Sequence, residues 1–280
     1  MNRDSAPQLS VAADLLVQSQ PGGTENRSVL NQAIHNVVGT VWHDEQSQVR
    51  NEFEGCASQF ITAVPLFVAG SRGYIASGIL SGLNQARLGD STGHQLEDLS
   101  LGALKGVATK ATFDHFGAKK WNFAAKGVTM GAFSRVVDVG LTRQTYDNGI
   151  GSGLQSTLLS GVHPVSLLTD VAVFGVAHYG LKLGKAIPAI EARPLLANAL
   201  NGTMFGFTSG ALGEVQRQWN DPSEHFDPLK VLARASASAA TMTLAAGTGF
   251  KLTEAAGMQP VVRQPTTTEL AAAESLSTKI

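Results

Sequence analysis

The stretch Leu83-Asn84-Gln85-Ala86-Arg87-Leu88-Gly89-Asp90 decides the fold, because its pattern returns twice further along the chain. Leu141-Thr142-Arg143-Gln144-Thr145-Tyr146-Asp147-Asn148 and Val215-Gln216-Arg217-Gln218-Trp219-Asn220-Asp221 are degenerate copies of it. In each copy an apolar helix ends in Gln and Arg, a turn of Asp, Asn or Gly follows, and another apolar helix begins after a short gap. Internal repetition of this kind is typical of stacked helix pairs. The sequence therefore predicts an all-α fold, an array or bundle of glycine-rich helix hairpins built from degenerate internal repeats.

Apolar periodicity predicts where the helices of this repeat region lie. Their expected ranges are 66–88, 96–116, 120–146, 165–187, 190–219 and 227–252. Asp227 is expected to cap the last of these helices, with Pro228 in its first turn, where proline is tolerated. The uncharged run 148–169 is rich in Gly, Ser and Thr and contains Pro164, and we expect a loop there.

Four segments follow from this pattern. Residues 1–28 are polar and predicted to be disordered or partly helical. Residues 29–64 are predicted to form one long amphipathic helix that starts after Ser28, and Pro65 is expected to break or kink it. Residues 65–254 are predicted to form a helical repeat domain. Residues 255–280 are predicted to be a flexible C-terminal tail, with one short helix that starts near Thr266.

The composition excludes several classes of function. Only 15% of the 280 residues are charged, the formal net charge is −1, and the mean hydropathy is +0.04. No basic stripe is available for phosphate contacts, so a nucleic-acid partner is not expected. The single cysteine, Cys56, excludes an intramolecular disulfide and a cysteine-rich zinc site. We expect a cytoplasmic protein, with membrane association as the alternative.

Glycines spaced four apart recur along the expected helices, and residues four apart share one helix face. The sets are Gly78 and Gly82, Gly102 and Gly106, Gly127 and Gly131, Gly180 and Gly184, and Gly202, Gly206 and Gly210. Each interior glycine costs roughly 1 kcal/mol relative to alanine, so a compensating gain is expected. Close approach of a neighbouring helix provides one, and both soluble bundles and membrane helices use it. We therefore predict that these glycines are structural helix contacts.

No motif in the sequence predicts a catalytic, cofactor-binding or metal site, and no cofactor is expected. Acids stand beside histidine at His43-Asp44-Glu45, at Asp114-His115 and at Glu224-His225 with Asp227. Adjacent residues on a helix do not face each other, so these groups are predicted to be solvated or to cap helices. Residues 149–153 match a phosphate-binding loop only in their glycine content, because no strand precedes them.

Arg87, Arg143 and Arg217 occupy matching places in the three copies of the pattern. Basic residues in a last turn favour the negative end of a helix, so a structural role is expected. The alternative is that the three arginines line a shared binding edge.

The favoured function is a non-enzymatic helical scaffold or interaction protein that binds a protein partner or itself; no small-molecule ligand can be identified. One alternative is a membrane-associated or membrane-active glycine-zipper protein, for which the uncharged run 194–213 is the strongest candidate segment. Lys105, Lys126, Arg135, Asp138 and Lys182 interrupt other apolar helices, so purification without detergent is expected. A further alternative is an enzyme with a site assembled from distant helices.

Overall fold

A computed structural model describes residues 27–44, 48–117, 121–187, 190, 193–220 and 226–257. Within these ranges the chain is helical and forms no strand; an isolated bridge joins Ser28 to Arg87. The all-α fold class is therefore confirmed. The predictions for 1–26 and 258–280, including the short C-terminal helix, lie outside the described residues.

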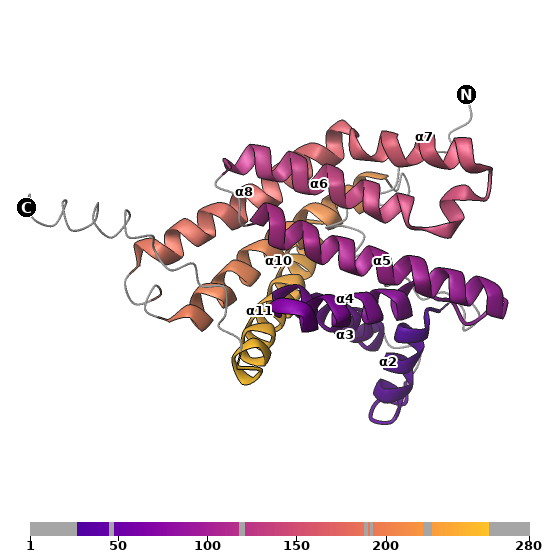
Figure 1. Cartoon of the computed structure of the whole chain (residues 1–280). Coiled ribbons are helices and arrows are strands. Elements are labelled where there is room, and N and C mark those ends of the chain that lie inside the picture. Colours follow the sequence, from indigo (N-terminus) through magenta and orange to yellow (C-terminus); the bar gives the residue numbers. More distant parts are fainter. Residues whose placement is uncertain are drawn as a thin grey trace, which may run out of the picture.

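The helices follow one another as short and long rods joined by brief connections (Figure 1). They are α2 Val29–Gly39, α3 Gln48–Phe67, α4 Gly70–Gln85, α5 Thr92–Gly117, α6 Phe123–Gly140, α7 Ile150–Gly161, α8 Pro164–Ala186, α10 Pro194–Asn220 and α11 Pro228–Ala255, with a 3-10 helix, η2, at Arg143–Tyr146.

The single helix predicted over 29–64 is wrong, because the structure contains two helices there. α2 ends at Gly39, residues 40–44 are not helical, and α3 begins at Gln48. The carbonyl of Trp42 accepts a hydrogen bond of 2.9 Å from Arg50 Nη1, which satisfies a backbone group that the break leaves without a helical partner. Pro65 does not end α3, which continues to Phe67. Ser28 caps α2 as predicted, since its hydroxyl accepts from the Asn31 N–H.

The loop predicted over 148–169 is also wrong, because α7 and the start of α8 occupy most of it. Gly149 has a φ of 100°, a conformation that favours glycine, and it turns the chain directly before α7. Pro164 is the first residue of α8, where its missing N–H leaves no helical hydrogen bond unmade. Gly149 and Pro164, which suggested a loop, therefore mark the starts of two helices.

Helix pairs make the closest contacts in the molecule. α4 packs along α5 and α10 along α11, while α6 lies against α7 and α8 (Figure 1). α11 also packs on α3, far away in the sequence, and Gln59 of α3 donates a 3.2 Å hydrogen bond to Ser238 of α11. The first helices are thereby tied to the last one.

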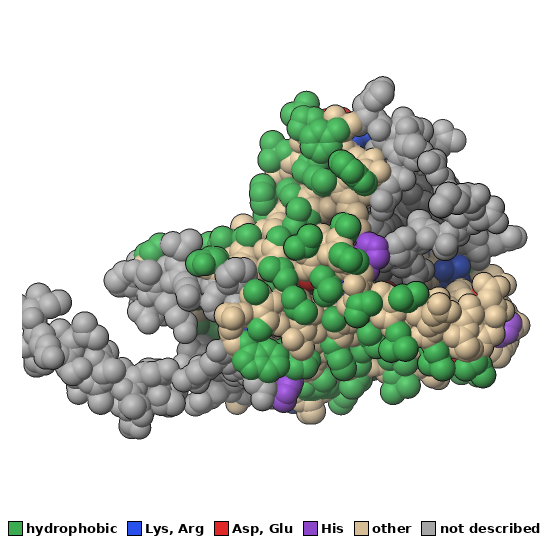
Figure 2. Space-filling model, turned by 90° about the horizontal axis from the view of Figure 1, so that it is seen from above, with side chains coloured by type: hydrophobic (Ala, Val, Ile, Leu, Met, Phe, Trp, Pro, Cys, Tyr) green, Lys and Arg blue, Asp and Glu red, His purple; other side chains and the backbone are tan. Residues whose placement is uncertain are grey.

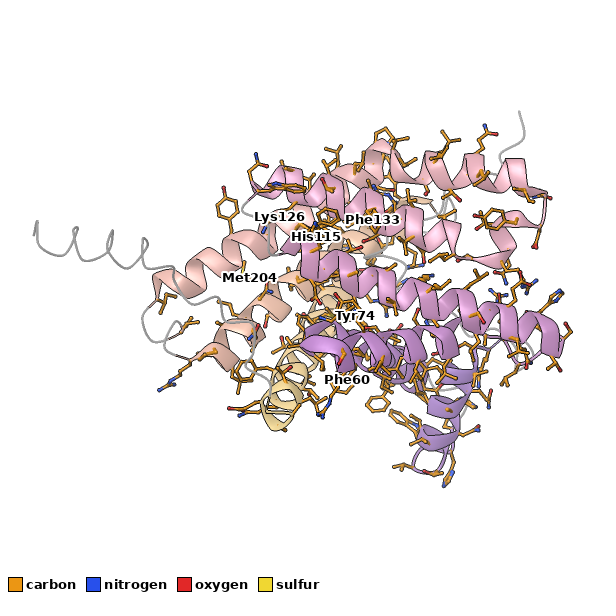
Figure 3. All side chains as sticks on the ribbon, in the orientation of Figure 1. Phe60, Tyr74, His115, Lys126, Phe133 and Met204 are labelled. Atoms are coloured by element: carbon orange, nitrogen blue, oxygen red, sulfur yellow. The ribbon has the colours of Figure 1, made fainter. Side chains whose placement is uncertain are left out.

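The apolar core is made mostly of small side chains. One cluster joins Ala63 of α3 to Met242 and Ala245 of α11, and Phe60, labelled in Figure 3, packs against it. Small residues allow close backbone approach but bury little apolar area per residue. Much of the larger aliphatic surface is consequently left outside the core.

The start of α11 gives a direct test of local stability. The Asp227 carboxylate accepts hydrogen bonds from the N–H groups of Leu229 and Lys230, as the predicted cap requires. Replacing Asp227 with alanine should lower the free energy of unfolding by about 0.5–2 kcal/mol. Denaturant melts of the full chain measure this change, and an unaltered midpoint would contradict the capping role.

Candidate functional site

Several charged side chains lie buried between the helices. Arg50 and Arg135 are among the largest fully buried side chains, and Asp98, Asp170 and Lys110 are buried as well. Buried charges are rare unless they are paired, so each one points to a specific partner.

Arg135 of α6 and Asp170 of α8 form the most deeply buried of these pairs; the exposed fractions of their side chains are 1% and 3%. Burial lowers the pKa of Arg135 to about 10, so the guanidinium remains charged at neutral pH and needs its counter-ion. Arg135 Nε also donates a 2.8 Å hydrogen bond to the carbonyl oxygen of Ser160, and Nη2 donates to that of Gly161 at 3.4 Å. One side chain thus joins α6, α8 and the C-terminal end of α7.

Two further pairs join α5 to the elements after it. Lys105 forms an ion pair with Asp138 of α6. Arg143 of η2 donates to Asp98 at 3.2 Å and to Asp90 at 2.6 Å. The hydrogen bond to the buried Asp98 is the main reason why the pKa of Arg143 is raised. These contacts hold η2 against the start of α5.

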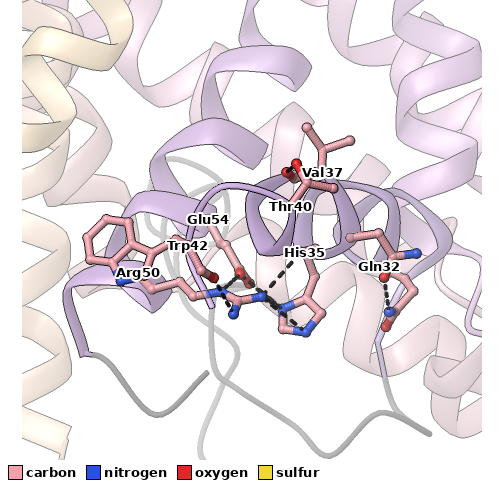
Figure 4. A network of polar contacts seen from close by, with 8 residues as sticks. Gln32, His35, Val37, Thr40, Trp42, Arg50 and Glu54 are labelled. Carbon is pink, nitrogen blue, oxygen red and sulfur yellow. Dashed lines mark hydrogen bonds and ion pairs between the residues drawn. The ribbon is translucent and has the colours of Figure 1, made fainter. Parts of the chain in front are cut away.

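A separate network joins α2 to α3 (Figure 4). Arg50 Nε donates to Glu54 at 2.8 Å, and Arg50 Nη2 lies 3.1 Å from His35 Nδ1. His35 Nδ1 lies 2.9 Å from Glu54 Oε1, so the three side chains form a closed triangle. The Trp42 carbonyl also belongs to the network, because it accepts a hydrogen bond from Arg50. The network thereby connects α2 to α3 across the break in the helix.

The hairpin of α10 and α11 carries its own polar group. Glu214 accepts hydrogen bonds from Arg217 and Gln218, and Gln218 also accepts from the Asp227 N–H. Burial by itself would raise the pKa of Glu214, but the hydrogen bonds from Arg217 and Gln218 and the charges of Arg217 and Arg234 together lower it.

The lowered pKa of Glu214 gives a prediction with a definite sign. Its carboxylate contributes stability above the ordinary value of 4.5, and that contribution is lost as the pH falls through the lower folded-state value. Glu214→Gln should therefore be less stable at neutral pH and should lose less stability on acidification. Urea melts between neutral and acidic pH test this. Glu254→Gln is the control, because Glu254 pairs with Lys251 on the surface, and an equal change in both variants would contradict the prediction.

The glycines of α4 and α5 face each other across the hairpin. A Cβ atom placed on Gly82 would lie 2.7 Å from the carbonyl oxygen of Leu99, and one on Gly102 would lie 2.7 Å from that of Ser81. A Cβ on Gly106 would collide with the Ser77 carbonyl, while one on Gly78 would be 3.3 Å from Val107 Cγ2. Three of these four positions thus leave no room for a larger residue.

The same closeness occurs between α10 and α11. A Cβ on Gly202 would lie 2.5 Å from the Met242 carbonyl oxygen, and one on Gly210 would lie 2.8 Å from Ser238 Cβ. A Cβ on Gly206 would collide with the Ser238 carbonyl. These glycines allow the two backbones to approach at every turn.

Between α6 and α8, one glycine faces the backbone of the neighbouring helix and the other faces a side chain. A Cβ on Gly127 would lie 2.5 Å from Val171 Cα, whereas one on Gly131 would collide with the Asp170 side chain. Gly131 therefore makes room for the buried ion pair rather than for a backbone. The surroundings of Gly180 and Gly184 are outside the described residues. The spacing pattern missed Gly249, where a Cβ would lie 2.6 Å from Phe67 Cβ of α3, because no second glycine stands four residues away.

Large aliphatic side chains occupy the outside. The face in Figure 2 shows many hydrophobic side chains and few charged ones. Over the molecule as a whole, exposed aliphatic side chains include Ile75 and Ile79 on α4, and Ile150, Leu154 and Leu158 on α7. Exposed apolar surface of this extent is typical of faces that contact another macromolecule or a membrane.

Those groups of residues considered for chemistry that the structure describes lie on separate elements. His43 and Asp44 are exposed in the break before α3, not on a helix as predicted. Asp114 accepts from Lys110 at 2.7 Å, and His115, labelled in Figure 3, packs its ring on Phe116. Glu45, Glu224 and His225 are outside the described residues. Within the described ranges, no group of three His, Cys, Asp or Glu side chains could hold a metal ion.

The first two of the three predicted arginine junctions lie side by side. Gln85 Nε2 donates to the Leu141 carbonyl at 2.8 Å, and Arg143 reaches Asp90. Arg87 is exposed beside Ser28, whereas Arg217 pairs with Glu214 inside the third hairpin. Whether the three form one binding edge stays a prediction.

No family model, no curated protein and no solved structure matches this chain. Its function has to be inferred from how its residues are arranged. The two features that stand out are the charge pairs between the helices and the aliphatic surface outside them, and sequence periodicity revealed neither one.

Proposed function

We propose that the chain is a non-enzymatic helical interaction protein, a scaffold that works through its apolar helix surfaces. The observation that carries this proposal is the distribution of side chains: paired charges such as Arg135 with Asp170 inside, and aliphatic residues such as Ile79 and Leu158 outside. Leaving so many aliphatic side chains in water is unfavourable. The exposed surface therefore favours a functional state in which a partner covers it.

The use made of the acids and bases supports a non-enzymatic role. Asp98, Asp138 and Asp170 each pair with a cation from a neighbouring helix element. Such pairs set the register between helices, because breaking one leaves an uncompensated buried charge. An enzyme assembled from distant helices would instead be expected to gather such groups around a cavity.

We further propose that α4–α5, α6–α8 and α10–α11 are degenerate copies of one glycine-rich hairpin. The close approach at Gly82, Gly127 and Gly206 supports this, since each lies where two helices of a pair meet. An experimental structure tests it by superposition of the three hairpins. Arg87, Arg143 and Arg217 should then fall at equivalent hairpin ends, and unrelated helix directions at these residues would refute the repeat.

We propose that the chain binds further copies of itself in detergent-free buffer. Sedimentation velocity should show an oligomer that a mild detergent dissociates. Detergent molecules would cover the same aliphatic side chains that a second copy of the chain covers in the oligomer. Ile75→Gln together with Ile79→Gln should weaken the oligomer. Lys251→Gln is the control and should not weaken it, because Lys251 is an exposed charged residue outside the aliphatic surface. A monomer at every concentration, unaffected by detergent, would overturn the proposal that this surface needs covering.

Membrane association is a second candidate function, favoured by one specific observation. No single described helix is long and apolar enough to cross a membrane, but α7 together with α8 as far as Val176 meets these criteria as a pair bent by 46°. Charged residues in the apolar helices spoke against lipid contact in the sequence. Pairing between helices weakens that objection for Lys105, Arg135 and Asp138. A cytoplasmic location, free or at a membrane surface, remains part of the proposal.

A further inference from the structure

We propose that the outer face of α7 and the first half of α8 contacts the hydrocarbon of a lipid bilayer. This α7–α8 face comprises Ile150, Leu154, Leu158, Val162, Val165 and Leu168. The inference rests on the proposed function, since it names what covers one of the apolar surfaces.

The α7–α8 face is a continuous aliphatic stripe. Ile150, Leu154 and Leu158 are spaced four apart on α7 and therefore share one side of it, and their exposed fractions are 73%, 52% and 69%. Val165 and Leu168 continue the stripe on α8 at 55% and 71%. From Ile150 to Val176 the two helices follow a path of roughly 40 Å at 1.5 Å per residue, which is long enough for the hydrocarbon core of about 30 Å.

No formal charge interrupts the stripe. The sequence from Asn148 to Thr169 contains no Asp, Glu, Lys or Arg. The first charged residue after it, Asp170, lies on the inner side of α8, paired with Arg135 and almost fully buried. A charge that points to the inside of the bundle with its counter-ion is the arrangement that lipid-facing helices require.

The bend between α7 and α8 also suits hydrocarbon. A broken helix leaves carbonyl groups without helical partners, and water is not available to them inside a bilayer. At this break Arg135 donates to the carbonyls of Ser160 and Gly161, and the Val162 N–H donates to that of Leu159. Arg135 therefore satisfies two carbonyl groups at the break, while Asp170 neutralises its charge.

Four hydroxyl groups of the segment have polar partners close by in the sequence. Thr157 donates to the Gly153 carbonyl, Ser160 to that of Thr157, and Thr169 to that of Val165. Ser166 lies 3.2 Å from His163 Nδ1. Hydrogen bonds of this kind lower the penalty for placing serine and threonine in hydrocarbon.

The residue types on the stripe favour lipid over a protein partner. Protein interfaces concentrate their binding energy in Trp, Tyr and Arg, and none of these stands on the α7–α8 face. The aromatic residues flank it instead: Tyr146 comes before α7 and Tyr179 after the apolar stretch, followed in sequence by Lys182 and Lys185. Tyrosine and lysine next to an apolar segment are typical of the boundary between hydrocarbon and headgroups.

Vesicle flotation tests the inference with the full chain. The protein, kept in mild detergent, is mixed with phosphatidylcholine vesicles, the detergent is removed, and the vesicles are floated on a density gradient. The native chain should float. Leu158→Lys with Leu168→Lys should lower the floating fraction more than about tenfold, because lysine is expelled from hydrocarbon.

The matched control is Leu96→Lys with Leu104→Lys, which places the same charges on exposed residues of α5. This variant should float as the native chain does. If the native chain self-associates but does not float, or if both variants float equally, the lipid contact is refuted while the proposed function stands. If the native chain neither floats nor self-associates, both fail.

A second measurement locates the contact even if a lysine variant fails to fold. Cys56→Ser removes the only thiol, and Leu158→Cys or Ile75→Cys then carries an environment-sensitive fluorophore. Vesicles containing brominated acyl chains should quench the label at position 158 and leave the label at 75 unaffected. Equal quenching at the two positions, or none at 158, would overturn the proposal.

Discussion

Replacing Asp170 with alanine should lower the free energy of unfolding by about 3–5 kcal/mol, the largest effect of any single substitution that we predict. The change leaves the guanidinium of Arg135 buried without a counter-ion between α6 and α8. Chemical denaturation of the full chain in mild detergent measures it, followed by circular dichroism. Glu254→Ala is the control, since it breaks an exposed pair and should change stability by less than about 1 kcal/mol.

A double substitution separates the charge effect from simple loss of packing. Arg135→Met with Asp170→Leu removes both charges and keeps apolar volume between the helices. Because replacing a whole buried pair is often nearly neutral, the double variant should be more stable than Asp170→Ala alone. If the single variant is as stable as the native chain, Arg135 and Asp170 do not form the buried pair described here.

The second large effect is expected for Gly206→Leu, which should destabilise the fold by roughly 1–3 kcal/mol through overpacking. Even a Cβ atom at this position would collide with the Ser238 carbonyl of α11, so α10 and α11 would have to separate. Gly131→Leu should act in the same way at the buried ion pair. Thermal and denaturant melts of the purified variants report the change.

The chain provides a matched control for the glycine argument. Gly93 stands in the first turn of α5, and nothing lies within 4 Å of the place where its Cβ would be. Gly93→Leu should be neutral or stabilising, because leucine favours the helix by up to about 1 kcal/mol over glycine. Equal stability of the Gly206 and Gly93 variants would mean that helix propensity alone governs these positions.

Local signals in the sequence were enough to predict most of the helices and some of their ends. The caps at Ser28 and Asp227 lie where the sequence placed them, because a cap depends on residues two or three positions away. The break before α3 was not predictable in this way. It is held by Arg50, which reaches back to Trp42 and His35 across the connection.

α7 was missed for a related reason. Its glycines weaken the helical signal of the sequence, but in the fold they give room for neighbours: Gly153 lies against the Tyr146 ring, and a Cβ on Gly161 would lie 2.8 Å from Val136 Cγ2. Tertiary packing offsets the low helix propensity of glycine here. The ion pairs were equally hidden, since Arg135 and Asp170 lie 35 residues apart and no motif joins them.

The central claim is that this fold buries paired charges between its helices and leaves many large aliphatic side chains outside. Labelling with a small apolar diazirine tests it most directly. The full chain in mild detergent is irradiated with the reagent, and the modified residues are identified by mass spectrometry. Adducts should concentrate on exposed aliphatic residues such as Ile79, Leu158 and Leu168, while Asp98 and Asp170 remain unmodified. Adducts on the inter-helix faces around Asp98 and Asp170, with none on α7 or α8, would contradict the claim.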